Sequence, residues 1–373
     1  MSAMAKLRTI AVLGAGHGGC AAAADLTARG YQVKLHARRE ATLEPLRKAG
    51  GINARGVQQG LFPIATMTTD VAEAIAGADL IMLVVPSSAH DYYAKALAGL
   101  IDGSVPIFIN PGHTAGGLHF RKELRDAGYR GPVMTGETVS LTYVTRMEGP
   151  ATVGIYSYTR NQRFAALPGR HADEMFEIVH AIYPETVQAT SVIETALGNM
   201  NAVFHPPGMI LNAGWIQRTD GNFLFYKEGI TDAVGRVCQA IDDERMAVAR
   251  ALDVPARPFL VNFYDAGLTS REGFESGSIA RACEESEPNQ TIKSPPSLDH
   301  RYVHEDIGYG LVPWSAFGKL AGVPTPAIDA MVRLAAIATG IDYEVTGLTL
   351  DKMGLHGLSV PQLKHFVETG ERE

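Results

Sequence analysis

The stretch RTIAVLGAGHGGCAAAADLTARGYQVKLHARR, residues 8–39, decides the fold of the first half of this chain. It opens with an apolar, β-branched run of the kind that is buried on both faces of a parallel sheet. Gly14, Gly16 and Gly19 follow as G-x-G-x-x-G, and a helix-favouring segment then leads through Gly30 to a second strand-like run, YQVKLHA. A strand, a glycine motif and a helix within about 30 residues predict a dinucleotide-binding βαβ unit of the Rossmann type.

The glycine motif has a direct physical purpose in such a unit. Glycines allow backbone N–H groups to approach a pyrophosphate, and the N-terminus of the following helix favours its negative charge. We therefore expect the dinucleotide to contact this loop at Gly14, Gly16, His17, Gly18 and Gly19. The alternative is a structural strand–turn–helix that binds no ligand.

The end of the second predicted strand bears on the choice between NAD and NADP. An acidic side chain there would accept hydrogen bonds from the adenosine ribose hydroxyls. The sequence has His36, Ala37, Arg38 and Arg39 instead. Two guanidinium groups at this position suit bidentate binding of a 2′-phosphate. We therefore expect NADP(H) to be favoured, with NAD(H) as the alternative if the arginines form only a solvated basic turn.

Two more apolar runs continue the α/β pattern, ADLIMLVVP at 78–86 and SVPIFIN at 104–110. In open parallel sheets, ligands bind beyond the carboxyl ends of the strands. By pattern, the residues at these ends are Val85, Pro86, Ser87, Asn110, Pro111, Gly112 and His113. We expect Val85, Pro86 and Ser87 to contact the cofactor. His113 is either a residue of the cofactor cleft or a satisfied loop histidine.

The composition is that of an ordinary globular protein and argues against several classes of function. Hydrophobic residues make up 46% of the chain and charged residues 20%, and the net charge of −7 offers no attraction for nucleic acid or an anionic membrane. Three cysteines without a CxxC pair argue against a disulfide framework or a structural zinc site, and for a reducing cytoplasm. No stretch is apolar for long enough to predict a signal peptide or a membrane span. We expect a soluble, cytoplasmic protein.

The length of 373 residues suits two domains. From about residue 188 the pattern becomes helical, with apolar positions three and four apart, as in ITDAVGRVCQAIDDERMAVARALDV at 230–254. We predict an α/β Rossmann domain at 1–187 followed by an all-α domain at 188–373. This combination is typical of an oxidoreductase with its substrate cleft between the domains, although the fold alone is weak warrant for a function.

The segment NAVFHPPG, residues 201–208, places His205 before two prolines in an apolar run. Helices avoid interior proline because its ring removes a donor and clashes with the preceding turn. We therefore expect the backbone to stop or kink here and to present His205 to a cleft. Imidazole, with an unperturbed pKa of about 6.5, can both give and take a proton near pH 7. The alternative is a satisfied core histidine.

Four segments together resemble the octopine/nopaline (opine) dehydrogenases, in order and spacing over nearly the whole chain. They are GAGHGG, NAVFHPPGM, FLFYKEGIT and HRYVHEDIGYGLVPW. The glycine motif is shared by many dehydrogenases, whereas N-x-x-x-H-P and R-Y-x-x-E-D-x-x-Y-G-L-V-P are much more specific. The resemblance implies NAD(P)H-dependent reductive condensation of an α-keto acid with the amino group of an amino acid. It also implies a helical C-terminal domain like that of 6-phosphogluconate dehydrogenase.

The resemblance further implies site residues in the second half. The family's His–Asp acid/base pair corresponds to His205 and Asp306, and the arginine before the acidic pair corresponds to Arg301. Glu305 and Asp299 remain competing partners for the histidine. If this stretch is helical, Arg301 and Asp306 lie about 140° apart at 100° per residue. Arg301 therefore either clamps the keto-acid carboxylate or pairs on the surface.

Several other residues are weaker candidates. Glu137, in GETVS, either meets a cationic amino-acid side chain or serves as a capping carboxylate. Asn201, one helical turn before the motif histidine, either lines the same face towards the substrate or packs as a polar residue. Tyr226, in FLFYKEG, suits simple core packing. His300 and His304 have a spacing that can chelate a metal on a helix, but without a third ligand we predict no metal site.

Three functions remain open. The leading hypothesis is an opine dehydrogenase that uses NADPH, an α-keto acid such as pyruvate and an L-amino acid. The second is a 2-hydroxy-acid or ketopantoate-type reductase, which would not require an amine. The third is a nicotinamide-nucleotide sensor, which would need no histidine–carboxylate relay. The expected partners are these small molecules alone, and the oligomeric state stays open, with a homodimer as one candidate.

Overall fold

The computed structural model describes residues 7–372, which form two units that correspond to the expected α/β and helical halves. The α/β unit contains the described residues up to 112, residues 116–195 and those from 365 onward, and the helical unit contains residues 113–115 and 196–364. The expected boundary at 187/188 differs from this division because β12 (Thr186–Gln188) still pairs with β11 in the sheet. The last residues return to the α/β unit, where Arg121 Nη2 donates to Gly370 O at 3.0 Å.

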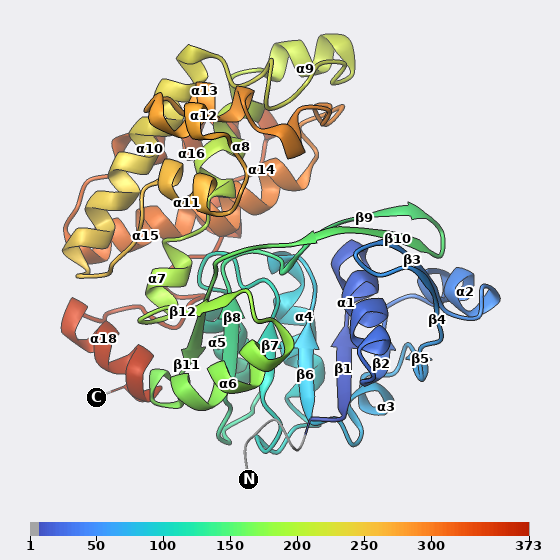
Figure 1. Cartoon of the computed structure of the whole chain (residues 1–373). Coiled ribbons are helices and arrows are strands. Elements are labelled where there is room, and N and C mark those ends of the chain that lie inside the picture. The colour runs from blue at the N-terminus through green and yellow to red at the C-terminus, as the bar shows by residue number, and fades with distance from the viewer. Residues whose placement is uncertain (1–6, 373) are drawn as a thin grey trace. The chain divides into compact units, whose positions relative to one another are not determined.

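An eight-stranded sheet forms the centre of the α/β unit, in the order β12-β11-β8-β7-β6-β1-β2-β5 (Figure 1). Its strands are β1 (Thr9–Leu13), β2 (Gln32–His36), β5 (Thr66–Thr68), β6 (Leu80–Leu83), β7 (Ile107–Ile109), β8 (Thr135–Thr138), β11 (Gln162–Leu167) and β12 (Thr186–Gln188). All neighbours are parallel except β8 and β11. The carboxyl ends of β1, β2, β6 and β7 therefore meet at one edge of the sheet, where ligands bind in open α/β folds.

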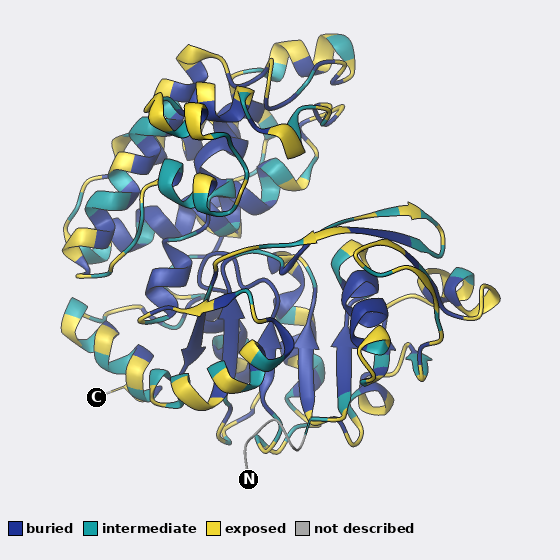
Figure 2. Ribbon diagram, in the orientation of Figure 1, coloured by how far each residue is buried: buried dark blue, intermediate teal, exposed yellow. Residues whose placement is uncertain are grey.

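Helices cover both faces of this sheet because successive strand residues point in opposite directions. Ile10 and Val12 belong to the hydrophobic core on one face, with α1 and α6. Ala11 and Leu13 belong to the core on the other face, with α3, α4 and α5. The helices of this unit are α1 (His17–Ala28), α2 (Glu40–Lys48), α3 (Val71–Ile75), α4 (His90–Leu97), α5 (Gly116–Asp126) and α6 (Ala172–Ile182). Burial on both faces explains the continuous apolar runs, and Figure 2 shows the central strands as buried.

A second sheet of four strands, in the order β4-β3-β10-β9, completes the unit. Its strands are β3 (Ile52–Gly56), β4 (Gly60–Phe62), β9 (Tyr143–Gly149) and β10 (Thr152–Tyr158). β3 and β10 are parallel, while the other two pairs are antiparallel. The strand-like segments that follow residue 133 in the sequence thus divide between two sheets.

The remaining helices belong largely to the helical unit. They are α7 (Val192–Ala196), α8 (Asn201–Ile210), α9 (Ala213–Thr219), α10 (Asp232–Ala251), α11 (Phe259–Asp265), α12 (Arg271–Glu275), α13 (Ile279–Glu284), α14 (Arg301–Asp306), α15 (Val312–Ala321), α16 (Pro326–Thr339), α17 (Tyr343–Thr346) and α18 (Val360–Thr369). The 20-residue helix α10 is capped by Thr231, whose Oγ1 accepts from Val234 N–H. Helices α10, α14 and α16 pack against α8, which makes α8 the centre of this unit.

Helix α8 runs through Pro206 and Pro207, so the expected break at His205 is absent. Each interior proline costs an intrahelical hydrogen bond and adds a clash, roughly 3 kcal/mol. Every residue from Ala202 to Ile210 is nevertheless buried, and three helices surround α8. The packing therefore outweighs the local preference, and tertiary contacts rather than a chain break set the position of His205.

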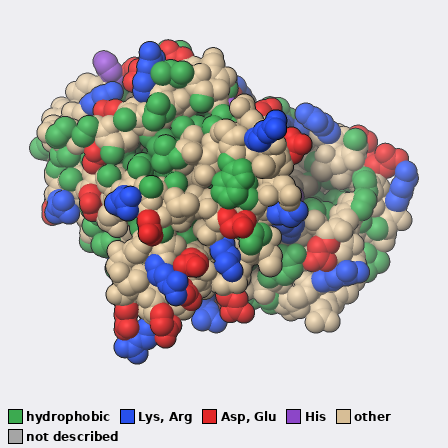
Figure 3. All heavy atoms as spheres, turned by 90° about the horizontal axis from the view of Figure 1, so that it is seen from above, with side chains coloured by type: hydrophobic (Ala, Val, Ile, Leu, Met, Phe, Trp, Pro, Cys, Tyr) green, Lys and Arg blue, Asp and Glu red, His purple; other side chains and the backbone are tan. Residues whose placement is uncertain are grey.

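The cysteines, the apolar character of the helices and the surface charges are the features on which the composition bears. Cys20, Cys238 and Cys283 are all buried and free. Within residues 7–372, no helix has both the length and the apolar character needed to cross a membrane. On the face shown in Figure 3, acidic and basic side chains are interspersed.

Candidate active site

The three motif glycines after β1, Gly14, Gly16 and Gly19, have different surroundings. Gly14 has φ +117°, and a Cβ there would lie 2.3 Å from Val84 O. A Cβ on Gly19 would lie 1.8 Å from Gly14 O, so helix α1 packs directly against the loop. Gly16 is exposed, and a Cβ on it would meet nothing within 4 Å. The outer glycines thus shape the turn, and Gly16 leaves space for close approach of a pyrophosphate to the backbone.

Other predicted cofactor residues lie around this loop. His17 is exposed as the first residue of α1, and the adjacent Gly18 is half-buried. Val85 is half-buried and Pro86 exposed just after β6, whereas Ser87 is buried at the start of a short 3₁₀ helix. The loop, the start of α1 and the end of β6 provide the backbone groups and open space that a dinucleotide needs.

The basic residues after β2 are accessible. Arg38 and Arg39 are both exposed, and the Arg38 guanidinium lies 5.5 Å from the centre of the Tyr92 ring. His36 is fully buried, with Nδ1 3.0 Å from Tyr93 OH and Nε2 3.2 Å from Thr69 O. His36 therefore has a structural role, while the two arginines keep donors available for a ligand.

The loop after β7 is held from within the α/β unit. Asn110 is buried and donates from Nδ2 to Thr142 Oγ1 at 2.8 Å, and its Oδ1 accepts from Thr142 N–H at 3.1 Å. A Cβ on Gly112 would lie 2.6 Å from Glu137 Oε2. Pro111 is also buried. These contacts fix the shape of the loop.

Glu137 is a buried carboxylate beneath this loop. Its Oε2 accepts from Gly117 N–H at 2.6 Å, and its Oε1 lies 2.5 Å from Thr195 Oγ1. Burial raises the pKa of Glu137 from its usual 4.5 to about 7. Both oxygens bond inside the unit, and Gly117 lies in the first turn of α5, so the contact with its N–H is a helix-capping one.

We expect Glu137→Gln to flatten the pH dependence of stability. Because the pKa of Glu137 is higher in the folded protein than in the unfolded chain, the folded state binds more protons between about pH 4.5 and 7. Stability therefore falls as the pH rises through this window, by up to about 3 kcal/mol. Glutamine mimics the protonated acid and removes this loss. Urea unfolding of both proteins across the window measures it, with the exposed Glu177→Gln as control; parallel slopes for wild type and Glu137→Gln would contradict the assignment.

His205 and Asp306 lie in contact in the helical unit. His205 is in the middle of α8, and Asp306 is the last residue of α14. Nδ1 of His205 lies 2.7 Å from Oδ2 of Asp306, and both side chains are about 5% exposed. A π-helical turn, Ile307–Leu311, follows Asp306 directly, and such turns are frequent at functional sites. The carboxylate fixes the orientation of the imidazole.

The competing carboxylates have other partners. Glu305 Oε2 lies 2.8 Å from Arg301 Nη2, one helical turn away. Asp299 Oδ1 lies 3.0 Å from Nε2 of His304. Residues 301–306 form helix α14, as the estimate of about 140° between Arg301 and Asp306 required, so these two side chains point in different directions. Arg301 remains about half exposed, with its ion pair on one side only.

The two histidines with chelating spacing have separate roles. His300 caps α14, since its Nδ1 accepts from Tyr302 N–H at 3.2 Å. Nδ1 of His304 lies 2.8 Å from Tyr343 OH, and its Nε2 is hydrogen-bonded to Asp299. Both contacts are of the kind that support a helix and its packing.

The sequence reasoning missed His113 as a partner of Glu305. His113 is buried in a left-handed conformation with φ 52°, and its Nε2 lies 3.6 Å from Glu305 Oε1. Burial lowers the pKa of His113, and among residues 7–372 its Nδ1 has no hydrogen-bond partner. Within the helical unit, Glu305 therefore connects His113 to Arg301. No local pattern could have paired residues so far apart.

Two tyrosines complete the surroundings of His205. Tyr226 OH lies 3.0 Å from His205 Nε2, and the Tyr302 ring stacks on the imidazole with centres 3.6 Å apart and planes at 13°. Tyr226, interpreted from the sequence as core packing, is therefore a hydrogen-bond partner of His205. Asn201 begins α8 half-buried, and its N–H donates to Asn199 Oδ1 at 3.1 Å. In the sequence, the only indication that these tyrosines belong to the site is that they lie in FLFYKEGIT and HRYVHEDIGYGLVPW, two of the segments that resemble the opine dehydrogenases.

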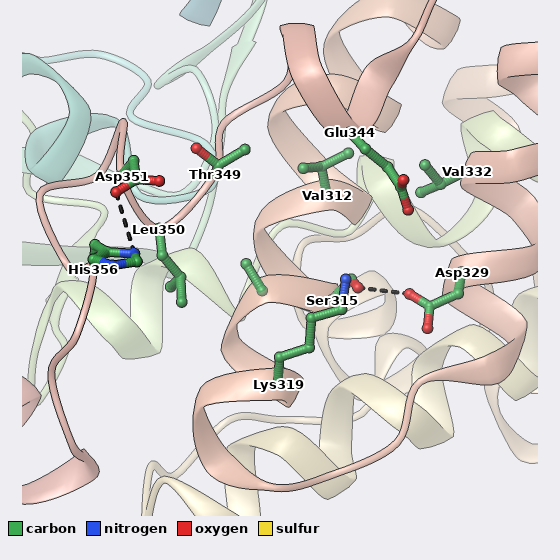
Figure 4. A pocket seen from close by; sticks show the side chains of 11 residues that line it. Val312, Ser315, Lys319, Asp329, Val332, Glu344, Thr349, Leu350, Asp351 and His356 are labelled. Atoms are coloured by element: carbon green, nitrogen blue, oxygen red, sulfur yellow. Dashed lines mark hydrogen bonds and ion pairs between the residues drawn. The ribbon is translucent and has the colours of Figure 1, made fainter.

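A separate pocket of about 250 Å³ lies in the helical unit (Figure 4). Its lining is Val312, Ser315, Ala316, Lys319, Asp329, Val332, Glu344, Thr349, Leu350, Asp351 and His356. Asp329 accepts from Ser315 at 2.6 Å, and Asp351 lies 3.3 Å from His356. Neither His205 nor its partners line this pocket, so the buried histidine–carboxylate pair is the better candidate for chemistry.

Comparisons with known proteins match both units. Residues 188–339 match the model of the NAD/NADP octopine/nopaline dehydrogenase alpha-helical domain, and residues 9–119 match the N-terminus of NAD-dependent glycerol-3-phosphate dehydrogenase. An opine dehydrogenase of Arthrobacter sp. (strain 1C) is 35% identical over 369 residues, covering 98% of this chain and 100% of that protein. A structure of octopine dehydrogenase with NADH and L-arginine has a TM-score of 0.76 at 20% identity, covering 98% of this chain and 99% of that one. A structure of yersinopine dehydrogenase with NADP⁺ bound has a TM-score of 0.70 at 17% identity. The match covers 97% of this chain and 98% of that one.

The full-length relative decides among the three functions that the sequence left open. It spans the dinucleotide loop of the α/β unit as well as the His205–Asp306 pair of the helical unit. The fold agrees, since the octopine dehydrogenase structure also covers nearly the whole chain. The chain therefore belongs to the opine (octopine/nopaline) dehydrogenase family, whose members are NAD(P)-dependent oxidoreductases that act on CH–NH groups.

Proposed function

We propose that this opine dehydrogenase uses NADPH to condense a pyruvate-like α-keto acid reductively with the amino group of an L-amino acid. The observation that carries the proposal is the contact of His205 Nδ1 with Asp306 Oδ2 at 2.7 Å, with both side chains buried. Loss of water from the intermediate carbinolamine requires a proton donor, and attack by the amine requires a proton acceptor. A histidine oriented by a carboxylate performs both tasks near pH 7.

His205 transfers protons through Nε2. Asp306 accepts from Nδ1–H, which leaves Nε2 as the nitrogen that takes a proton from the amine and gives one to the departing hydroxyl. The charge of Asp306 stabilises the imidazolium between these steps, as in other histidine–carboxylate relays. A nicotinamide cofactor held at the glycine loop after β1 would supply the hydride.

Arg301 and Asn201 are the proposed substrate contacts. The Arg301 guanidinium is about half exposed and is held by Glu305 at 2.8 Å, which leaves donors for a bidentate bond to the keto-acid carboxylate. Asn201 lies four residues before His205 on α8, so the two side chains share one face of that helix. Its amide offers both a donor and an acceptor to the substrates.

The preference for NADPH rests on Arg38 and Arg39. Both are exposed immediately beyond β2, where the adenosine ribose lies in this type of fold. Ala37 and the two arginines follow the strand directly, and the next residue, Glu40, is ion-paired with Arg47. Among the relatives, octopine dehydrogenase has been solved with NADH and yersinopine dehydrogenase with NADP⁺.

We expect Arg38→Ala to raise the KM for NADPH by roughly 10- to 100-fold, the scale of one lost charge-assisted contact. The KM for NADH should change little, because NADH lacks the 2′-phosphate. Steady-state kinetics with both cofactors measure the difference. Arg55→Ala, at an exposed arginine of the same unit, is the control. Equal effects of Arg38→Ala on both cofactors would remove the 2′-phosphate role.

The reaction itself is tested by following NADPH oxidation with pyruvate, with and without a panel of L-amino acids. Oxidation that needs both partners supports reductive condensation, and the best amine identifies the substrate. Oxidation with the keto acid alone would instead indicate a hydroxy-acid reductase. No oxidation with any pyruvate-like keto acid and any amine would overturn the proposal.

A further inference from the structure

The second ring nitrogen of His205 is also occupied within the helical unit. Nε2 lies 3.0 Å from Tyr226 OH, which in turn lies 3.3 Å from Tyr302 OH. With the Asp306 contact, four side chains form a continuous chain of hydrogen bonds from Asp306 through His205 and Tyr226 to Tyr302. The nitrogen that must exchange protons with substrate thus has a neighbour that can also carry a proton.

The direction of these hydrogen bonds follows from the donors available. An ionised carboxylate only accepts, so Asp306 requires the proton of neutral His205 on Nδ1. Nε2 is then an acceptor, and Tyr226 OH must donate to it. The Tyr226 oxygen in turn accepts from Tyr302 OH. Both tyrosine bonds therefore point the same way, from Tyr302 towards Nε2.

The solvent exposure of the side chains increases along this series of hydrogen bonds, from His205 to Tyr302. His205 and Asp306 are each 4% exposed and Tyr226 is 5% exposed, whereas Tyr302 is only partly buried. Burial raises the pKa of Tyr226 well above its ordinary value, and the neighbouring Tyr302, Cys283 and Asp306 raise it further. Tyr226 therefore stays neutral, and it passes a proton on only while it receives another.

The proposed reaction requires such a supply of protons. An α-keto acid, an amine in its ammonium form and NADPH give a secondary ammonium product, water and NADP⁺. The ammonium nitrogen gives up two protons before the iminium forms, and both leave with the oxygen as water. The secondary amine left after hydride transfer then takes one proton. This proton must reach the site from solvent in each turnover. His205 is buried with both nitrogens bonded to protein, so this proton has to arrive through one of its neighbours.

We propose that Tyr226 supplies a proton to Nε2 of His205 in each turnover, with Tyr302 as its donor and solvent as the source. This inference rests on the proposed function. After hydride transfer, the O–H bond of Tyr226 breaks and an N–H bond forms at Nε2. His205 passes this proton to the nitrogen of the product amine and is again neutral, ready to accept a proton from the next substrate ammonium. Tyr226 takes the proton of Tyr302, which is reprotonated by solvent. Nε2 has one bonding position, so Tyr226 and the substrate occupy it in turn, and Tyr226 is a positioning residue that acts through His205.

Tyr226→Phe in the full-length protein tests the relay, because phenylalanine keeps the ring and removes only the hydroxyl. We expect kcat to fall by about 10- to 100-fold, at or below the scale of a lost general acid–base. The KM values for both substrates should stay within about twofold. The rate of the variant should rise with the concentration of imidazole buffer at constant pH and ionic strength, since a small acid can replace the hydroxyl. Wild type should not respond.

Two further variants separate a relay from a structural role. Tyr302→Phe interrupts the same chain one link further out and should show the same buffer dependence. Tyr343→Phe is the matched control, because Tyr343 is 2% exposed and bonds His304 Nδ1 at 2.8 Å. It removes the same kind of bond from another histidine and should leave kcat independent of buffer. Thermal unfolding and NADPH binding show whether each variant is folded.

The outcomes distinguish the relay from the reaction. Unchanged kcat in Tyr226→Phe would overturn the relay, and so would a lower kcat in a folded variant without any response to buffer. If Tyr226→Phe does not fold, the buffer dependence of Tyr302→Phe decides in the same way. Wild type, measured alongside, reports on the proposed function independently: if wild type condenses the substrates and the variants show no buffer response, the relay alone fails.

Discussion

Replacing His205 with alanine is expected to lower kcat by about two to four orders of magnitude, the usual scale for loss of a general acid–base group. The imidazole is oriented by Asp306, whose Oδ2 lies 2.7 Å from Nδ1. Under the proposed mechanism, its removal would delete both the acceptor for the amine proton and the donor for the departing hydroxyl. NADPH binding should persist, because the dinucleotide loop belongs to the other unit. Stopped-flow or steady-state turnover and NADPH fluorescence titration measure the two quantities.

Asp306→Asn sharpens this prediction. The amide can donate to Nδ1, which would move the imidazole proton to Nε2 and leave no acceptor for the amine. We expect a comparable loss of kcat with the ring still in place. The matched control is His304→Ala, which removes a histidine of α14 that is also paired with a carboxylate, Asp299. Near-normal turnover in folded His205→Ala would contradict the assignment, as would an equal loss of kcat in the His304→Ala control.

Replacing Arg245 with methionine is expected to cost about 3–5 kcal/mol of the free energy of unfolding. Arg245 and Asp242 are each 2% exposed on α10, with Nε and Oδ1 2.9 Å apart. Arg245 also donates from Nη2 to Arg257 O at 2.8 Å and from Nη1 to Leu197 O. Without the guanidinium, the Asp242 carboxylate is left buried and without its cation, although Phe259 N–H still donates to it at 2.9 Å.

Urea unfolding of wild type and Arg245→Met measures this cost. Arg236→Met is the control, since Arg236 is exposed on the same helix. The double variant with Asp242→Leu should recover part of the loss, because it removes the unpaired charge together with its partner. A loss below about 1 kcal/mol in Arg245→Met would mean that the ion pair behaves as a solvent-exposed one.

Local sequence was sufficient to predict the structure of the α/β unit near its dinucleotide loop. The apolar run of β1, the glycines and the start of α1 are adjacent in sequence, and their geometry depends on contacts among themselves. Gly19 packs against the carbonyl oxygen of Gly14 in the same motif. The same holds for the helical periodicity of α10 and for the helix at 301–306, from which the divergence of Arg301 and Asp306 was predicted.

At the histidine site, local sequence could not determine which carboxylate contacts His205. Residue types and family resemblance identified His205 and Asp306, but Asp299 and Glu305 were equally available within the same short stretch. Their separation depends on how α14 packs against α8, which brings together His205 and Asp306 from 101 positions apart. The packing around α8 also carries this helix through two prolines, against the local preference for a break.

Sequence by itself thus determined the two halves of the fold, the dinucleotide loop and the kinds of side chain available for acid–base chemistry, because periodicity and turn chemistry act over a few residues. Tertiary structure decided which carboxylate orients His205, that Tyr226 bonds its other nitrogen, and that Glu137 is buried under a loop. These pairings join residues 20 to 101 positions apart. Only the packing of whole helices and strands brings such residues within hydrogen-bonding distance.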